Sequence, residues 1–98
     1  MKTPEFEINA GNGPAPDDMI VDLRGFYIHM MDFVVSAVYD GPDTDVLCRF
    51  IDEHDNVFTS TLDHDGYTQS LNKCLGYFES MEEFERCTII KRILNERL

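Results

Sequence analysis

Eight acidic residues gather near the ends of two runs in the middle of the chain that have the composition of strands. They are Asp40, Asp43, Asp45, Asp52, Glu53, Asp55, Asp63 and Asp65. In an extended chain the Cα atoms of Asp43 and Asp45 would lie about 6.6 Å apart, because a strand rises about 3.3 Å per residue. Two steps along one DNA strand advance about 6.8 Å. Carboxylates at this spacing would imitate a phosphate backbone, and a basic cleft of another protein that holds nucleic acid would bind them.

Aromatic side chains lie among these acidic residues and would supply the contact area of an interface. We single out Tyr39, Phe58 and Tyr67, because aromatic anchors often dominate binding free energy. Residues 1–65 hold fourteen acidic and three basic residues and carry the whole formal charge of −11, whereas residues 66–98 hold five of each. This charge disfavours binding to DNA, RNA or an anionic membrane and favours a basic protein surface. These acidic and aromatic residues are therefore our predicted partner-binding site.

Other chemistries lack a supporting motif. If Asp65 is placed at position 5 of an EF-hand loop, Thr61 and Asn72 fall at positions 1 and 12, where acidic ligands are required. The three His and three Cys have no close spacing of zinc ligands. The chain has no nucleophile elbow, dinucleotide loop or Walker loop. We therefore expect a protein that is not an enzyme and that holds neither metal nor cofactor.

The cysteines and the apolar segments indicate the cellular compartment in which the protein is expected. Cys48, Cys74 and Cys87 are odd in number, lie among apolar neighbours and have no CxxC spacing, which predicts buried free thiols in a reducing compartment. No apolar segment typical of a signal peptide follows Met1. The longest apolar stretch, residues 26–39, is interrupted by polar residues and is too short to span a bilayer. We expect a cytoplasmic protein that makes no membrane contact.

Three strands are predicted to position the acidic residues. Residues 45–51 and 57–62 are rich in β-branched and aromatic side chains, and the polar segment 52–56 between them has the length of a hairpin loop. Residues 27–39 end at a strong turn signal, Asp-Gly-Pro-Asp, and have a mostly apolar face at alternate positions. The pattern predicts three antiparallel strands in meander order. A helix over the first part of residues 27–39 is the alternative.

The last third of the chain changes to a helical period. Apolar residues recur at the spacing of one helix face over residues 71–78. The following run, 80–97, starts with the spacing of a capping box and places acids early and bases late, which complements the helix dipole. The predicted class is α+β: a three-stranded antiparallel meander with two C-terminal helices on one face. An all-β, OB-like five-stranded barrel, with strands over 70–78 and 88–94, is the alternative.

The N-terminal residues are predicted to form an arm and a linker. Residues 4–8 alternate apolar and acidic side chains, which is compatible with an added strand at a sheet edge, but a frayed terminus is the favoured interpretation. Residues 9–16 read N-A-G-N-G-P-A-P, which cannot continue a helix or a central strand. We therefore expect an extended arm and Gly/Pro linker over 1–16 and a single globular domain over 17–98.

These features predict a small acidic binding protein without catalytic activity. The specific hypothesis is a nucleic-acid mimic that inhibits a basic, nucleic-acid-handling protein, as viral anti-defence inhibitors encoded by phages do as a class. Such a protein would be a monomer or a homodimer and would bind no nucleic acid itself.

Two other hypotheses stay open. An OB-like nucleic-acid-binding module would need a basic groove, and the available cluster is Arg86, Lys91, Arg92 and Arg97. A homo-oligomeric accessory protein with no ligand would use a helix–helix interface made of Ile89, Ile90, Ile93 and Leu94. The residues resemble no known family.

Overall fold

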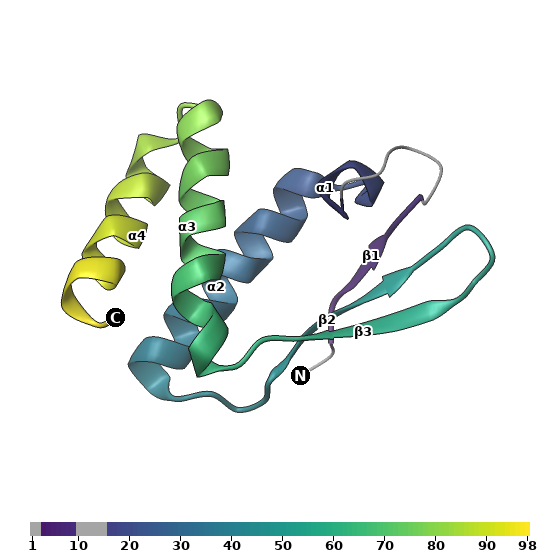
Figure 1. Ribbon diagram of the computed structural model, residues 1–98, viewed down its shortest axis with the longest axis horizontal. Coiled ribbons are helices and arrows are strands. Elements are labelled where there is room, and N and C mark those ends of the chain that lie inside the picture. The colour runs from purple at the N-terminus through teal and green to yellow at the C-terminus, as the bar shows by residue number, and fades with distance from the viewer. Residues whose placement is uncertain (1–2, 10–15) are drawn as a thin grey trace.

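The computed structural model describes residues 3–9 and 16–98, and its fold is α+β (Figure 1). The elements in chain order are β1 (Glu5–Glu7), α1 (Pro16–Met19), α2 (Leu23–Asp40), β2 (Val46–Ile51), β3 (Val57–Thr61), α3 (His64–Ser80) and α4 (Phe84–Glu96). The α+β class is confirmed, and the OB-like barrel is not favoured, because residues 70–78 and 88–94 are helical. Residues 10–15 of the expected linker lie outside the described ranges.

The strand predicted over residues 27–39 is wrong, because these residues belong to α2. Buried side chains recur along α2 with the period of a helix: Phe26, Tyr27, Met30, Met31, Val34 and Ala37. The valines of this run favour a strand by intrinsic propensity, but packing overrides that preference. The helical alternative for the first part of the run is right, and the helix continues to Asp40.

The meander order is also wrong, because the third strand comes from the N-terminal arm. β1 pairs parallel with β2, and β2 pairs antiparallel with β3, so that the sheet order is β1-β2-β3. Phe6 of β1 contacts Phe26 of α2 edge to face, with ring centroids 5.6 Å apart. This contact leaves Phe6 half-buried, whereas Glu5 and Glu7 are exposed. The favoured interpretation of the arm as a frayed terminus is wrong, and the alternative, a strand added at the sheet edge, is right.

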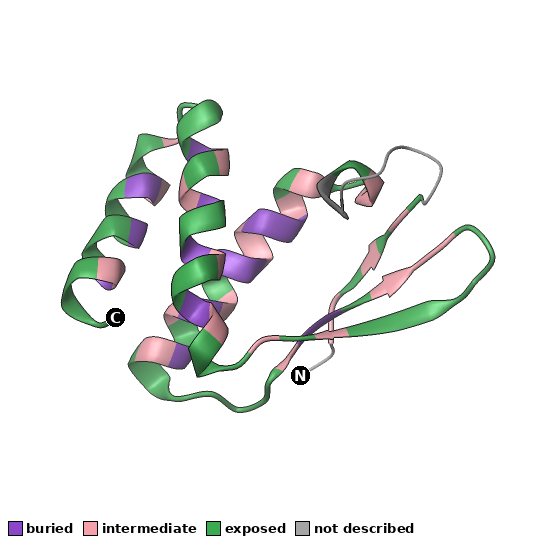
Figure 2. Cartoon of the chain, viewed as in Figure 1, coloured by how far each residue is buried: buried purple, intermediate pink, exposed green. Residues whose placement is uncertain are grey.

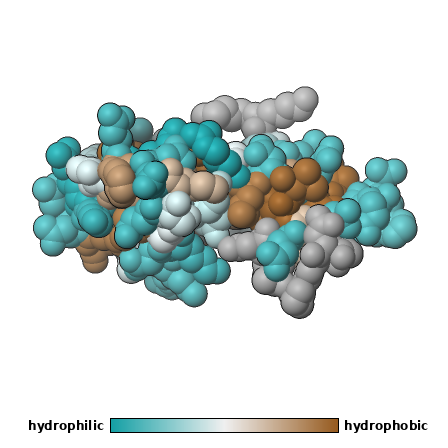
Figure 3. All heavy atoms as spheres, turned by 90° about the horizontal axis from the view of Figure 1, so that it is seen from above, coloured by the Kyte–Doolittle hydropathy of each residue, from teal (hydrophilic) through white to brown (hydrophobic). Residues whose placement is uncertain are grey.

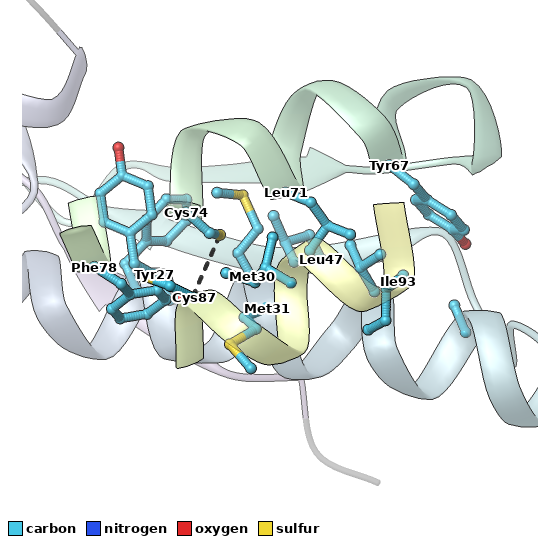
Figure 4. Close-up of a cluster of buried hydrophobic side chains, with 14 of the residues drawn as sticks. Tyr27, Met30, Met31, Leu47, Tyr67, Leu71, Cys74, Phe78, Cys87 and Ile93 are labelled. Carbon is cyan, nitrogen blue, oxygen red and sulfur yellow. Dashed lines mark hydrogen bonds between the residues drawn. The ribbon is translucent and has the colours of Figure 1, made fainter. Parts of the chain in front are cut away.

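The two C-terminal helices are confirmed, and together with α2 they form the main core (Figure 4). α3 contributes Tyr67, Leu71, Cys74 and Phe78 to this core, and α4 contributes Cys87, Ile90 and Ile93. Burial is concentrated where α2, α3 and α4 face one another, and much of the β2–β3 hairpin is exposed (Figure 2).

The turn between α3 and α4 is a Schellman motif with a glutamate at the position that usually holds glycine. The Glu83 N–H donates to the Phe78 carbonyl, and the Glu82 N–H donates to the Glu79 carbonyl. Glu82 has a φ of 58°, in the left-handed region. Because this conformation crowds a Cβ atom, the turn carries backbone strain at Glu82.

The thiols of the core are buried and unpaired, as the sequence predicts. Cys48, Cys74 and Cys87 are all free and buried. The Cys74 thiol donates to the Tyr27 carbonyl, with sulfur and oxygen 3.7 Å apart (Figure 4). Burial raises the pKa of Cys48 to about 11 and that of Cys74 to about 12. Both thiols therefore stay neutral at physiological pH.

We expect Glu82→Gly to raise the free energy of unfolding by about 1 kcal/mol, because glycine adopts the left-handed conformation without the cost of about 1–2 kcal/mol that a side chain adds. Urea denaturation followed by circular dichroism measures the change. Glu82→Ala is the matched control: it removes the same charge but keeps Cβ, and we expect a change within about 0.5 kcal/mol. If the two substitutions change the free energy of unfolding equally, the loss of charge causes the change, and Glu82 carries no backbone strain.

We expect Cys48 and Cys74 of the folded protein to resist a thiol reagent at pH 8, because the thiolate is the reacting species. Both should react after unfolding in urea. Mass spectrometry of proteolytic fragments identifies the labelled residues. Rapid labelling of either thiol in the native protein would contradict the burial described here.

Candidate protein-binding surface

The structure divides the eight predicted acidic residues between the two ends of the β2–β3 hairpin. At one end, where α2 leads into β2 and β3 leads into α3, lie Asp40, Asp43, Asp45, Asp63 and Asp65; we call these the junction cluster. At the other end lie Asp52, Glu53 and Asp55, which we call the turn cluster. The length of β2 separates the clusters by roughly 20 Å at the rise of a strand. The predicted residues therefore form two anionic areas rather than one continuous row.

Three members of the junction cluster line a pocket of about 450 Å³. Asp43, Asp45 and Asp63 line it together with His64 and Arg97. The chain bends at Asp43 and at Asp45, so the strand-rise spacing expected for these two residues does not apply. The Leu62 N–H donates to the Asp45 carbonyl at 2.6 Å, which holds this loop beside the start of α3.

The three predicted aromatic residues have different surroundings. Tyr67 is buried in the core, with 3% of its surface exposed, and also lines the junction pocket. Tyr39 is 48% exposed, and the Arg97 guanidinium lies over its ring, 4.8 Å from the centroid. Phe58 is 51% exposed on β3. Of the three, Phe58 therefore offers a partner the most accessible ring face.

The turn cluster contains one carboxylate that organises the hairpin loop. Asp52 Oδ1 accepts hydrogen bonds from the backbone N–H groups of His54 and Asn56, both at 2.9 Å, and Oδ2 accepts one from Asn56 Nδ2 at 3.0 Å. The Asn56 side-chain bond, with the backbone bonds of Asn56 and His54, lowers the pKa of Asp52. Asp55 has a φ of 63°, a conformation that Asp tolerates better than most residues. Glu53 and Asp55 are exposed and are the members of this cluster most open to a partner.

The acidic residues of both clusters have no ion pair with the described basic side chains. Across residues 3–9 and 16–98 the ion pairs formed are both at Glu83, whose Oε1 lies 2.7 Å from Arg24 Nη2 and 3.3 Å from Arg86 Nε. Glu83 thus ties the start of α2 to the α3–α4 turn. The charge of the two clusters is left for solvent, counterions or a partner.

Several basic and apolar residues of α4 are used within the chain, whereas Lys91 and Arg92 of the predicted basic cluster are exposed. Arg86 pairs with Glu83 and lies over the Phe78 ring, 5.5 Å from its centroid. Ile90 and Ile93, predicted for a helix–helix interface between copies, have no exposed surface, whereas Ile89 is 44% exposed. Most of that predicted interface is therefore occupied by the internal packing of α4.

Arg97 and the outer edge of β3 border the clusters but were not among the predicted partner-binding residues. Arg97 was expected only in a basic cluster with Arg86, Lys91 and Arg92, and its place on Tyr39 arises from a contact between residues far apart in the chain. β3 carried a detectable signal: its five residues, V-F-T-S-T, contain no charge. In the view from above, the surface is largely hydrophilic, with an apolar area over the end that carries the sheet (Figure 3).

Comparisons with known proteins add no relative. The chain matches no protein-family model, no curated protein sequence and no solved structure. Among the described residues, no group of three or more His, Cys, Asp or Glu side chains is placed to hold a metal ion. None of the helices in that part of the chain combines the length and the apolar character that a membrane span requires.

We expect the amide NMR signals of His54 and Asn56 to titrate with a midpoint below the ordinary Asp pKa of about 3.9. The pKa of Asp52 is lower in the folded state than in the unfolded state, so its hydrogen bonds stabilise the loop at pH values above the ordinary carboxyl pKa. This stabilisation is lost as the pH falls through the folded-state pKa. Asp52→Asn should abolish this titration, whereas Glu53→Gln should leave it intact. A midpoint at or above 3.9 would contradict the role of Asp52.

Proposed function

We propose that this protein is a non-catalytic binding protein whose anionic clusters engage a basic surface on another protein. The observation that carries the proposal is the set of eight carboxylates at the two ends of the hairpin, none of which has an ion pair with a described basic residue. Exposed charges at loop ends keep their hydration until a partner arrives. Long-range attraction by such charges accelerates encounter and makes the complex sensitive to salt.

The junction cluster is the better candidate for the main contact. Its three pocket-lining aspartates surround a cavity large enough for a long basic side chain, and apolar atoms of Ala37 and Val38 contribute to the wall. An arginine or lysine there would gain carboxylate partners for its charged group and apolar contact for its stem. Arg97 of this chain already lies against the same pocket and stacks on Tyr39.

The class of partner follows from the charge. A basic cleft that normally holds DNA or RNA attracts carboxylates for the same reason that it attracts phosphates. We propose a nucleic-acid-handling protein as the partner, with this chain acting as its inhibitor. Because the acidic residues form two areas, the imitation would consist of two anionic contacts rather than a continuous backbone.

We expect affinity capture from a cell lysate to recover basic nucleic-acid-binding proteins that moderate salt releases. Duplex DNA should also release them, because it competes for the same cleft. The triple variant Asp43→Asn, Asp45→Asn and Asp63→Asn should lower affinity roughly tenfold, since each exposed ion pair contributes about 0.2–1 kcal/mol. Quantitative mass spectrometry of the salt and DNA eluates measures these effects.

The matched control removes the same charge away from the junction cluster, at Asp18, Asp32 and Glu79, all exposed. This control should retain the captured proteins. Equal losses in the two triple variants would show that net charge, not the junction cluster, drives binding. Saturable binding of labelled single-stranded DNA by the native chain at low salt would contradict the proposal directly.

A further inference from the structure

The outer edge of β3 is an unpaired sheet edge. β3 has β2 as its sole neighbour in the described sheet, and most of its residues are exposed (Figures 1 and 2). The Asp52 N–H donates to the Asn56 carbonyl, and the Leu62 N–H donates to the Asp45 carbonyl. Backbone groups along an antiparallel strand alternate between its two sides. Val57, Thr59 and Thr61 therefore direct their backbone N–H and C=O groups away from β2.

This edge lacks the features by which proteins block further pairing. β3 contains no charge, proline or glycine, and the register shift in the hairpin lies in β2, between Val46 and Cys48. Val57 is 55% exposed and Phe58 is 51% exposed. An added strand would satisfy the open backbone groups and would cover both side chains.

The charges at the two ends of β3 restrict what can pair with it. The turn cluster lies just before β3, and Asp63 and Asp65 of the junction cluster lie just after it. In a symmetric antiparallel pairing of two copies about Thr59, Asp55 of each copy would lie opposite Asp63 of the other. Like charges opposite each other destabilise a strand pair. A segment that is uncharged at its centre and basic at both ends fits without this repulsion.

We infer that β3 receives an extended segment of the partner as a fourth strand of the sheet. The segment has about five uncharged residues, rich in β-branched side chains, opposite residues 57–61, and basic residues at each end opposite the two acidic clusters. Backbone hydrogen bonds provide the pairing, and the charged ends provide the selectivity. The inference rests on the proposed function. It adds that the partner presents an extended segment, which the two clusters recognise together.

The experiment titrates the ¹⁵N-labelled protein with a synthetic nine-residue peptide that has two lysines at each end and alternating threonine and valine between them. The amide signals of Val57, Thr59 and Thr61 should shift, and the shifts yield the dissociation constant. A peptide with glutamates in place of the lysines should not bind. Raising the salt concentration should weaken binding of the lysine peptide, because exposed charges are screened.

A pair of substitutions separates backbone pairing from side-chain contact. Thr59→Pro removes an N–H that points away from β2, so the hairpin keeps its own ladder, and proline is tolerated on edge strands. It should weaken peptide binding about tenfold, the factor that corresponds to one hydrogen bond. Thr59→Ala keeps the N–H and should change affinity by less than about threefold. N-methylation of the central peptide amides that face β3 tests the same bonds with the protein unchanged.

The outcomes distinguish failure of this inference from failure of the proposed function. If Thr59→Pro and N-methylation leave peptide affinity unchanged, strand pairing is overturned, but recognition of basic partners stands. If the lysate capture succeeds and the peptide does not bind, the partner does not supply an extended segment. If both fail, neither proposal holds. Self-association that broadens the Val57 and Thr59 signals would make a second copy the occupant and overturn the partner described here.

Discussion

The packing of α2 between the sheet and the other helices is the constraint on which the structure depends. On one side, Phe26 contacts Phe6 and Phe50 of the sheet, with ring centroids 5.6 Å away in each case. On the other, Tyr27 stacks on Tyr77 of α3 at 4.5 Å. A small domain holds together only if each layer buries its apolar face against another. Burial of one large apolar side chain contributes about 1.5–3 kcal/mol, so α2 joins the two halves mainly through such side chains.

The position of α2 also determines where the acidic loops lie. His29 of α2 donates from Nε2 to the Leu47 carbonyl at 2.7 Å, beside the irregularity in the register of β2. This contact holds the start of β2 against the helix. The bent loop that carries Asp43 and Asp45 is then confined between the end of α2 and the start of α3. Because ionised carboxylates are costly to bury, the aspartates occupy the ends of the hairpin, and β3 between them is uncharged.

The accuracy of prediction from sequence differed between local and long-range features. The hairpin of β2 and β3 and the two C-terminal helices could be predicted, because turn residues and hydrophobic period act within a few positions. The valines at 34, 35 and 38 suggested a strand, yet helical packing of Met30, Met31 and Val34 prevailed. An edge strand at β1 was only the alternative to a frayed terminus, because its parallel pairing joins residues more than forty positions apart. No local pattern encodes such a pairing.

The amino-acid sequence alone determined the charge asymmetry, the uncharged character of β3 and the acidic residues that flank it, because these are properties of adjacent positions. Tertiary structure decided how they are used. It divided the acidic residues between two ends of a hairpin, enclosed Tyr67, placed Arg97 over Tyr39 and left β3 at the edge of the sheet. The physical reason is that the exposure of a residue and its distance from other residues depend on which apolar surfaces, far apart in the sequence, pack together. In this protein the packing of α2 against the sheet and against α3 determines both.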